Sequence, residues 1–216
     1  MKNLFLASLL TLMSGIGFAQ ERELSEDCKK NIGYIAVYAE QNMYRDAADF
    51  WSKAIKACGT EVFLPQEWSN ARTIYIKLME TDTAAARQKE LQDSIYWCYD
   101  MEMKYHPTAD LAADYAAKLV KGQSKDRAKI DDLFNQSVHQ LKEKLSINEM
   151  ILYFYHVVSK YNLADGEEAK EEARNYAIEE YLKLSDYISV AKKAYTERGN
   201  AKAVDGYERA QGYLDN

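Results

Sequence analysis

Apolar residues recur along this chain at helical spacings, and the clearest example lies within residues 38–55. Small and large side chains alternate there at intervals of four and three, as Ala47, Trp51 and Ala54. This spacing places them on one face of a helix, where a large side chain fits the gap left by small ones on a neighbouring helix. Asn42 precedes this helix and tolerates the left-handed backbone of a tight turn. The pattern predicts a helical hairpin.

Helix-start and helix-stop signals divide the next part of the chain in the same way. Gly59 follows the hairpin and suits a helix C-terminus. Pro65 and Pro107 each precede a helical pattern, because a proline in the first turn removes no hydrogen bond that the helix would make. Polar residues at 80–83 and 121–124 mark two further turns. We expect helices at about 28–41, 44–58, 65–79, 84–105 and 108–120, and another around 130–138.

Two capping boxes mark the helices that should follow. Ser146 with Glu149, and Asp165 with Glu168, have the spacing at which a side chain caps the first turn of a helix. The second of these helices should be long and reach Tyr195. Its expected buried residues are Ala173, Ala177, Tyr181, Leu184 and Ile188. Residues 199–216 keep a weak helical spacing and form a predicted C-terminal helix that caps the last hairpin or frays.

The composition agrees with a chain that is nearly all helix. There are 2 prolines and 9 glycines in 216 residues, which leaves little material for tight turns and hairpins of strands. The formal net charge is −6, and no basic run is present. Nucleic acid and an anionic membrane surface are therefore not expected as partners.

Residues 1–19 have the pattern of a cleavable signal peptide. A short basic start precedes an apolar run over residues 4–13, and Gly17 and Ala19 are the small residues that predict cleavage before Gln20. The run is interrupted too early to span a membrane, and no cysteine follows it directly as a lipid anchor would require. We expect a mature chain that is soluble, without membrane insertion, and located in the periplasm or secreted.

The hairpin at residues 38–55 resembles the later part of a tetratricopeptide repeat, in which aromatic and small residues alternate around a turn. Trp68-x2-Ala71-Arg72-x2-Tyr75 and Leu111-Ala112-x2-Tyr115 have the spacing of the residues that open such a repeat. Arg72 stands where that family has a very small residue, which puts close approach of the helices there in doubt. The resemblance implies an all-α fold, a right-handed α-α superhelix of about four degenerate hairpins over residues 20–198.

The chain also resembles exported tetratricopeptide proteins of Bacteroidota envelopes. These pair a cysteine before the first helix with another at the end of the partner helix, and Cys28 and Cys58 occupy such positions here. Export implies an oxidising compartment, and the start of one helix lies beside the end of its antiparallel partner. We therefore predict a disulfide between these two residues and a buried free thiol at Cys98. The alternative is three free thiols.

Residue patterns that would carry catalysis are missing from the sequence. The three histidines, His106, His139 and His156, have no partner at metal-ligand spacing, and the cysteines are too scattered for zinc. No serine-hydrolase elbow or glycine-rich phosphate loop is present. We predict no catalytic residue, no metal and no cofactor, and a protein that is not an enzyme. Thr83 resembles an O-glycosylation site of Bacteroidota envelopes, and its modification is left open.

The leading hypothesis is a non-catalytic scaffold or adaptor of the cell envelope that binds a protein or peptide partner. The first helix of each hairpin would form the concave side of the array. The residues predicted to line this groove are Ile32, Ala36, Ala39, Ser69, Thr73, Ile76, Ala109, Ala113 and Ala116. The alternative is that this row packs against the next turn of the array.

A second hypothesis, from another functional class, is a glycan-binding accessory protein of an outer-membrane uptake system. Some binding proteins of such systems resemble this chain in being built on the same helical repeats. Trp51 and Trp68 fall on repeat-packing positions and are expected in the core. Trp97 is the better candidate for an exposed contact with a partner or a sugar. The oligomeric state is left open.

Overall fold

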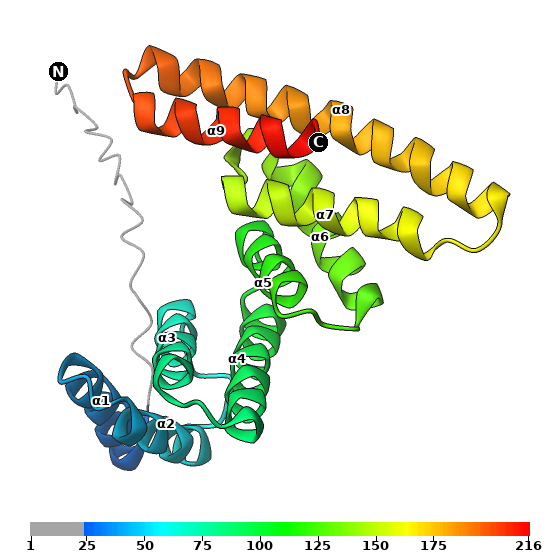
Figure 1. Ribbon diagram of the computed structural model, residues 1–216. Helices are drawn as coiled ribbons and strands as arrows, with labels where there is room; N and C mark the ends of the chain where they lie inside the picture. Colours follow the sequence, from blue (N-terminus) through cyan, green and yellow to red (C-terminus); the bar gives the residue numbers. More distant parts are fainter. Residues whose placement is uncertain (1–23) are drawn as a thin grey trace, which may run out of the picture.

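The computed structural model describes residues 24–216, and the regular structure in this part of the chain is all helical, without a strand (Figure 1). The predicted signal peptide at residues 1–19 lies outside it. The elements are α1 (Glu26–Glu40), α2 (Tyr44–Cys58), α3 (Pro65–Thr81), α4 (Ala85–Tyr105), α5 (Ala109–Lys121), α6 (Arg127–Leu141), the short 3-10 helix η1 (Lys142–Lys144), α7 (Ile147–Leu163), α8 (Glu167–Glu197) and α9 (Ala201–Leu214). The prediction of an all-helical fold is confirmed.

Helices that follow one another in the chain pack as pairs. The pairs are α1 with α2, α3 with α4, α5 with α6 and α7 with α8, and α9 packs on both α8 and α7. Between pairs, α2 contacts α3, α4 contacts α5, and α5 contacts α7. The C-terminal helix is therefore a packed cap and not a frayed end.

The first three pairs begin and end close to the predicted boundaries. Asn42 adopts the left-handed backbone expected at the first turn, with φ of 60°. Pro65 is the first residue of α3, and Gly59 follows α2 at φ of 77°. These residues were sufficient to predict the helix boundaries, because each determines the backbone conformation of its own turn.

The two predicted capping boxes have different outcomes. Ser146 caps α7 as predicted: its Oγ accepts from the Glu149 N–H at 3.2 Å, and Glu149 accepts from the Ser146 N–H at 2.7 Å. The box at Asp165 is wrong. Gly166, at φ of 82°, precedes α8 instead, and α8 begins at Glu167 without a side-chain cap. Glycine adopts a positive φ without a steric penalty, so Gly166 takes the position directly before α8.

An aromatic cluster, which we call the N-terminal core, forms where α2 meets α3. Trp51 lies 4.7 Å from Phe63 and 5.1 Å from Trp68, measured between ring centroids, and all three side chains are buried. The predicted disulfide is confirmed: Cys28 and Cys58 are joined, with 5.2 Å between their Cα atoms. It ties the start of α1 to the end of α2. The predicted burial of Cys98 as a free thiol is also confirmed.

A larger cluster, the C-terminal core, extends from α4 to α9. Its buried residues include Ile95, Tyr99, Leu111, Tyr115, Ile130, Phe134, Val138, Met150, Val157, Leu184, Ile188, Tyr207 and Leu214. The two cores meet at α4, where Cys98 faces the N-terminal core and its neighbour Tyr99 belongs to the C-terminal core. This helix therefore couples the two halves of the described chain.

Arg72, which stands at a position where a small residue is typical, is buried between α3 and α4. Its guanidinium lies 4.2 Å from the centre of the Tyr99 ring and pairs with the buried carboxylate of Glu102. A cation over an aromatic face is favourable, and the carboxylate neutralises the charge. The large side chain at this position is thus accommodated by an ion pair and an aromatic ring between the two helices.

Candidate functional site

The α7–α8 hairpin projects beyond the rest of the molecule, as Figure 1 shows on its right-hand side. The helix α8 has 31 residues, whereas α9, which packs along it, has 14. The helix α9 covers the C-terminal half of α8 and ends near Tyr181, whose hydroxyl donates to Asp215 Oδ1 at 2.9 Å. Beyond this point, within residues 24–216, α9 no longer lies over the space between α7 and α8.

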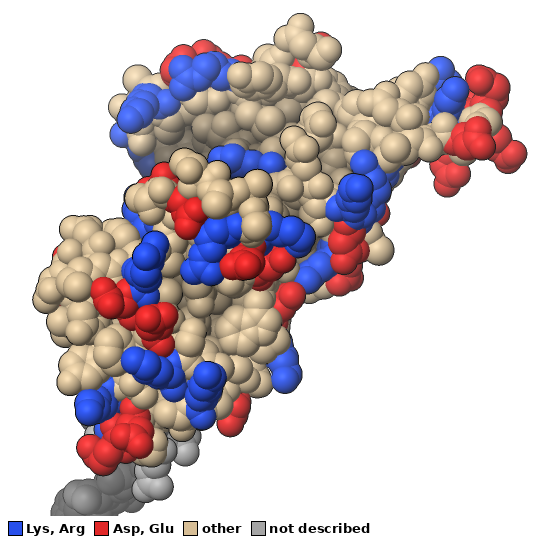
Figure 2. Space-filling model, turned by 60° about the horizontal axis from the view of Figure 1, so that its bottom comes forward, with Lys and Arg blue, Asp and Glu red and all other residues tan. Residues whose placement is uncertain are grey.

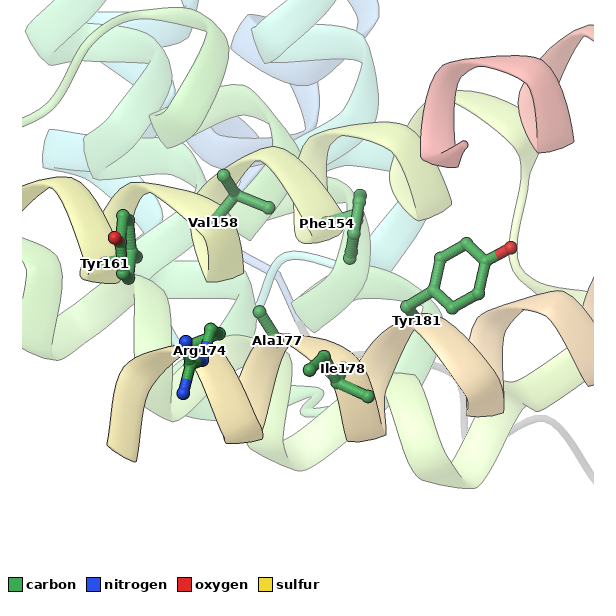
Figure 3. Close-up of a pocket in the computed structure, with 7 residues that line it drawn as sticks. All are labelled: Phe154, Val158, Tyr161, Arg174, Ala177, Ile178 and Tyr181. Atoms are coloured by element: carbon green, nitrogen blue, oxygen red, sulfur yellow. The ribbon is translucent and has the colours of Figure 1, made fainter. Parts of the chain in front are cut away.

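This uncovered part of the hairpin contains an apolar groove of about 380 Å³, which we call the hairpin groove (Figure 3). Its lining residues from α7 are Phe154, Val158 and Tyr161, and those from α8 are Arg174, Ala177, Ile178 and Tyr181. Apart from the adjacent Ala177 and Ile178, successive lining residues within each helix are three or four residues apart, so each helix presents one stripe to the groove. Hydrocarbon surface dominates between the two stripes.

Large exposed apolar side chains are frequent on the α7–α8 hairpin, and Val158, Tyr161 and Ile178 among them line the hairpin groove. Of the thirteen in the described chain, six lie between residues 155 and 182. They are Tyr155, Val158, Tyr161, Leu163, Ile178 and Leu182, with exposed fractions from 37% to 67%. Single exposed apolar residues are common, but a contiguous group of them marks an interaction surface.

The tip of the hairpin is acidic. Glu167, Glu168, Glu171 and Glu172 are all exposed in the first two turns of α8. Figure 2 shows a group of acidic side chains in red at the right-hand end of the molecule, with Lys or Arg atoms in blue beside it. Arg174, at the edge of the groove, lies 3.7 Å from the carboxylate of Glu171. The groove is thus apolar along its length and negative at one end.

A buried polar network holds α8 in place on the side away from the groove. Glu180 is only 1% exposed, and its carboxylate accepts from the Tyr153 hydroxyl at 2.7 Å and from Lys183 Nζ at 2.7 Å. His139 Nε2, from α6, lies 3.3 Å from the same carboxylate. Burial raises the pKa of Tyr153, and the adjacent carboxylate raises it further, so the phenol stays protonated as the donor. This network joins α8 to α7 and α6.

A second cavity, of about 700 Å³, lies between the α5–α6 connection and α7. Lys121, Lys125 and Arg127 lie around it, and Arg127 donates to the Ser159 hydroxyl at 3.0 Å. Its floor includes Ile130 and Ile151. The mixture of cations and hydrocarbon gives it a different chemistry from the hairpin groove.

His156 forms the buried wall of this second cavity. Its Nε2 lies 2.8 Å from Asp131 Oδ1, and Lys160 Nζ lies 2.6 Å from the same oxygen. Burial lowers the pKa of His156 and outweighs the neighbouring carboxylate, so the imidazole is neutral near pH 7. Burial acts to raise the pKa of Asp131, but hydrogen bonds from Lys160 and His156 outweigh it, and that pKa is lowered. The group joins α6 to α7.

The residues predicted to line a concave groove are not brought together by the fold. Ala36 and Thr73 are exposed, whereas Ile32, Ala39, Ser69, Ile76 and Ala109 are half-buried. Over residues 24–216, α1 and α3 do not pack extensively on each other, nor do α3 and α5.

Two of those predicted positions, Ala113 and Ala116, are fully buried. Their assignment to a surface groove is wrong for this fold. The helix α5 packs against α4, α6 and α7, so its inward row is covered on all sides by neighbouring helices. The alternative, in which these alanines pack within the array, holds at both positions.

The tryptophans lie where their spacing placed them. Trp51 and Trp68 are in the core, while Trp97 is 37% exposed and packs edge-on against Trp68 at 5.6 Å. The hairpin groove, by contrast, was missed. A signal for it is present: Ile178 and Leu182 add a second apolar stripe to a helix that already buries Leu184 and Ile188. An apolar face that is wider than the neighbouring helices can cover indicates a further contact.

Among the described residues, no helix is long and apolar enough to cross a membrane, and no group of side chains could hold a metal ion. Comparison with protein-family models, with curated proteins and with solved structures finds no match to this chain.

Proposed function

We propose that this protein is an exported, non-catalytic scaffold that binds a partner protein through the hairpin groove. The four pairs would form a right-handed superhelix like that of tetratricopeptide proteins. Support comes from the order of the pairs and from the burial of residues at repeat positions, among them Trp51, Trp68 and Tyr115. The disulfide supports an oxidising compartment such as the periplasm.

The observation that carries the proposal is the gathering of exposed apolar side chains on one hairpin. Six of thirteen such residues in the described chain lie within a stretch of 28 residues, and three of them, Val158, Tyr161 and Ile178, line an open groove. Leaving this surface in water is unfavourable by roughly 25 cal/mol per Å² of apolar area, so covering it would favour association. We therefore assign partner binding to the fourth hairpin rather than to the predicted concave row.

A matched pair of variants tests the proposal. Ile178→Glu puts a charge into the groove, whereas Val190→Glu puts the same charge at an exposed position, 45% accessible, further along α8. We expect both variants to melt like the parent, and only Ile178→Glu to lose a defined partner that co-purifies from the native envelope and is identified by mass spectrometry. Equal partner recovery with both variants would contradict the assignment of the site.

A further inference from the structure

One helix of this chain, α9, already packs on the surface between α7 and α8 and shows what kind of segment binds there. The helix α9 packs there through Tyr207, Ala210 and Leu214, which are buried and lie three and four residues apart. Polar contacts at its edges accompany them, such as the 3.1 Å hydrogen bond from Gln211 to Ser185. This surface therefore accepts one apolar stripe of a helix with polar flanks.

The hairpin groove continues the seat of α9. Tyr181 belongs to both, because its hydroxyl bonds to Asp215 at the end of α9 while its side chain lines the groove. Figure 3 shows the end of α9 beside Tyr181 and the groove running on between the two helices. From Glu167 to Tyr181, α8 extends for about 21 Å at 1.5 Å per residue. That length accommodates about four helical turns.

Charge sets the polarity of a helix bound in this place. The helix α9 runs antiparallel to α8, so a helix that follows its line would direct its C-terminal end towards the acidic tip (Figure 1). A helix C-terminus carries a partial negative charge and is stabilised by lysine or arginine in its last turn. Those same cations would face Glu167, Glu168, Glu171 and Glu172.

Resting on the proposed function, we infer that the hairpin groove binds an amphipathic helix of a partner protein, collinear with α9, whose C-terminal turn is basic. The apolar stripe of that helix covers Val158 and Ile178, and its basic end covers the acidic tip. The groove thus selects by apolar spacing along its length and by charge at one end.

Two synthetic peptides of equal composition test this inference. Both are fluorescent 14-residue helices with apolar residues at the spacing of Tyr207, Ala210 and Leu214; one has three lysines in its last turn and the other has them in its first. By fluorescence anisotropy at low salt, we expect the C-terminally basic peptide to bind at least tenfold more tightly. The difference should shrink at high salt, because exposed charges are screened. Equal affinities would overturn the inferred polarity.

Variants of the whole chain locate the binding. Ile178→Glu should weaken both peptides at least tenfold, and Val190→Glu should weaken neither. Replacing the four glutamates of the tip by glutamine should make the two peptides bind equally while both still bind. Peptide binding that is insensitive to Ile178→Glu would overturn the assignment of the groove.

The outcomes separate this inference from the proposed function. If neither peptide binds while the native partner is still lost on Ile178→Glu, the scaffold role stands and the helical ligand is wrong. If the C-terminally basic peptide binds but no native partner depends on Ile178, the chemistry of the groove stands and the scaffold role fails. A dimer detected by light scattering and dissolved by Ile178→Glu would mean that a second copy occupies the groove, which also overturns the inference.

Discussion

The N-terminal core and the C-terminal core hold their helices by different means. In the first, α1 buries only Cys28 and Ile35, and the disulfide to Cys58 fixes it to α2. In the second, α5 alone buries seven residues and packs on three other helices. A helix at the end of an array has neighbours on one side only, so it either gains a covalent tie or stays weakly held.

The C-terminal helices also lack neighbours on one side, but no disulfide fixes them. The helix α9 covers half of α8 and the buried Glu180 network braces the hairpin, but the outer half of the hairpin remains uncovered. In the described chain, the first hairpin is thus tied by a cross-link, whereas the last hairpin leaves an apolar groove uncovered. This groove is where a partner can contribute the missing contacts.

The largest effect should follow from truncating the N-terminal core. Trp68→Ala removes a fully buried ring that contacts Trp51, Phe63 and Trp97, and should lower the free energy of unfolding by about 3 to 5 kcal/mol. Urea denaturation of the parent and the variant measures this loss of stability. Trp97→Ala is the matched control and should cost less, because that side chain is 37% exposed. Equal losses in the two variants would show that Trp68 is not the centre of the cluster.

The disulfide should contribute nearly as much to the free energy of unfolding as the Trp68 side chain. It closes a loop with a sequence separation of 30 residues, for which loop-closure entropy gives about 3 to 4 kcal/mol. Replacing Cys28 and Cys58 by serine should cost that amount, and hydrogen exchange should quicken in α1 and α2 before it does in α7 to α9. Cys98 serves as the internal control, since burial raises its pKa to about 12 and it should react with a thiol reagent only after unfolding. Uniform quickening along the chain would contradict separate stabilities for the two cores.

The helices and turns that could be predicted from the sequence are those determined by residues close together in the chain. Asn42 and Pro65 each act within one turn, and the spacing of Ala47, Trp51 and Ala54 identifies a packing face without reference to its partner. The disulfide followed because two helix ends of one hairpin must meet.

What the sequence did not reveal depends on contacts between distant residues. Arg72 pairs with Glu102, thirty residues away in the chain. Glu180 accepts a hydrogen bond from Tyr153 on α7 and lies beside His139 on α6. In sequence each looks like a solvent-exposed charge on a helix. The position of the site was missed for the same reason, since only the packed array shows that α9 stops halfway along α8.

A moderate effect should follow from removing the carboxylate that braces the projecting hairpin. Glu180→Ala leaves the buried Tyr153 hydroxyl without its carboxylate acceptor, which costs about 1 to 3 kcal/mol. Thermal unfolding with and without the mutation measures the loss. Glu179→Ala, at the exposed neighbouring position, is the control and should change stability by no more than about 0.5 kcal/mol. If both changes are equally mild, the network is not what holds α8 to α7 and α6.

The smallest effect should be a pH dependence confined to the C-terminal core. Burial lowers the pKa of His156 below its usual value of about 6.5, so between the lowered pKa and 6.5 the unfolded chain binds more protons than the folded one. Stability should therefore be constant above about pH 7 and decline as the pH falls below about 6.5. The groups around the imidazole are Asp131 and Arg127 on α6 and Lys160 on α7. The lowered pKa of Asp131 makes its own loss of stability begin only near pH 4, outside this window.

Urea unfolding between pH 5 and 7.5 resolves this contribution, with His156→Gln as the comparison, because glutamine can still donate a hydrogen bond to Asp131 but does not titrate. The variant should lose part of the decline that the parent shows below pH 6.5. The first amides to exchange faster at pH 5.5 should lie in α6 and α7, while α1 and α2, held by their disulfide and distant from the imidazole, should exchange as they do at pH 7.5 after correction for the intrinsic rate. An identical decline in parent and variant would place the pH-sensitive group elsewhere in the chain.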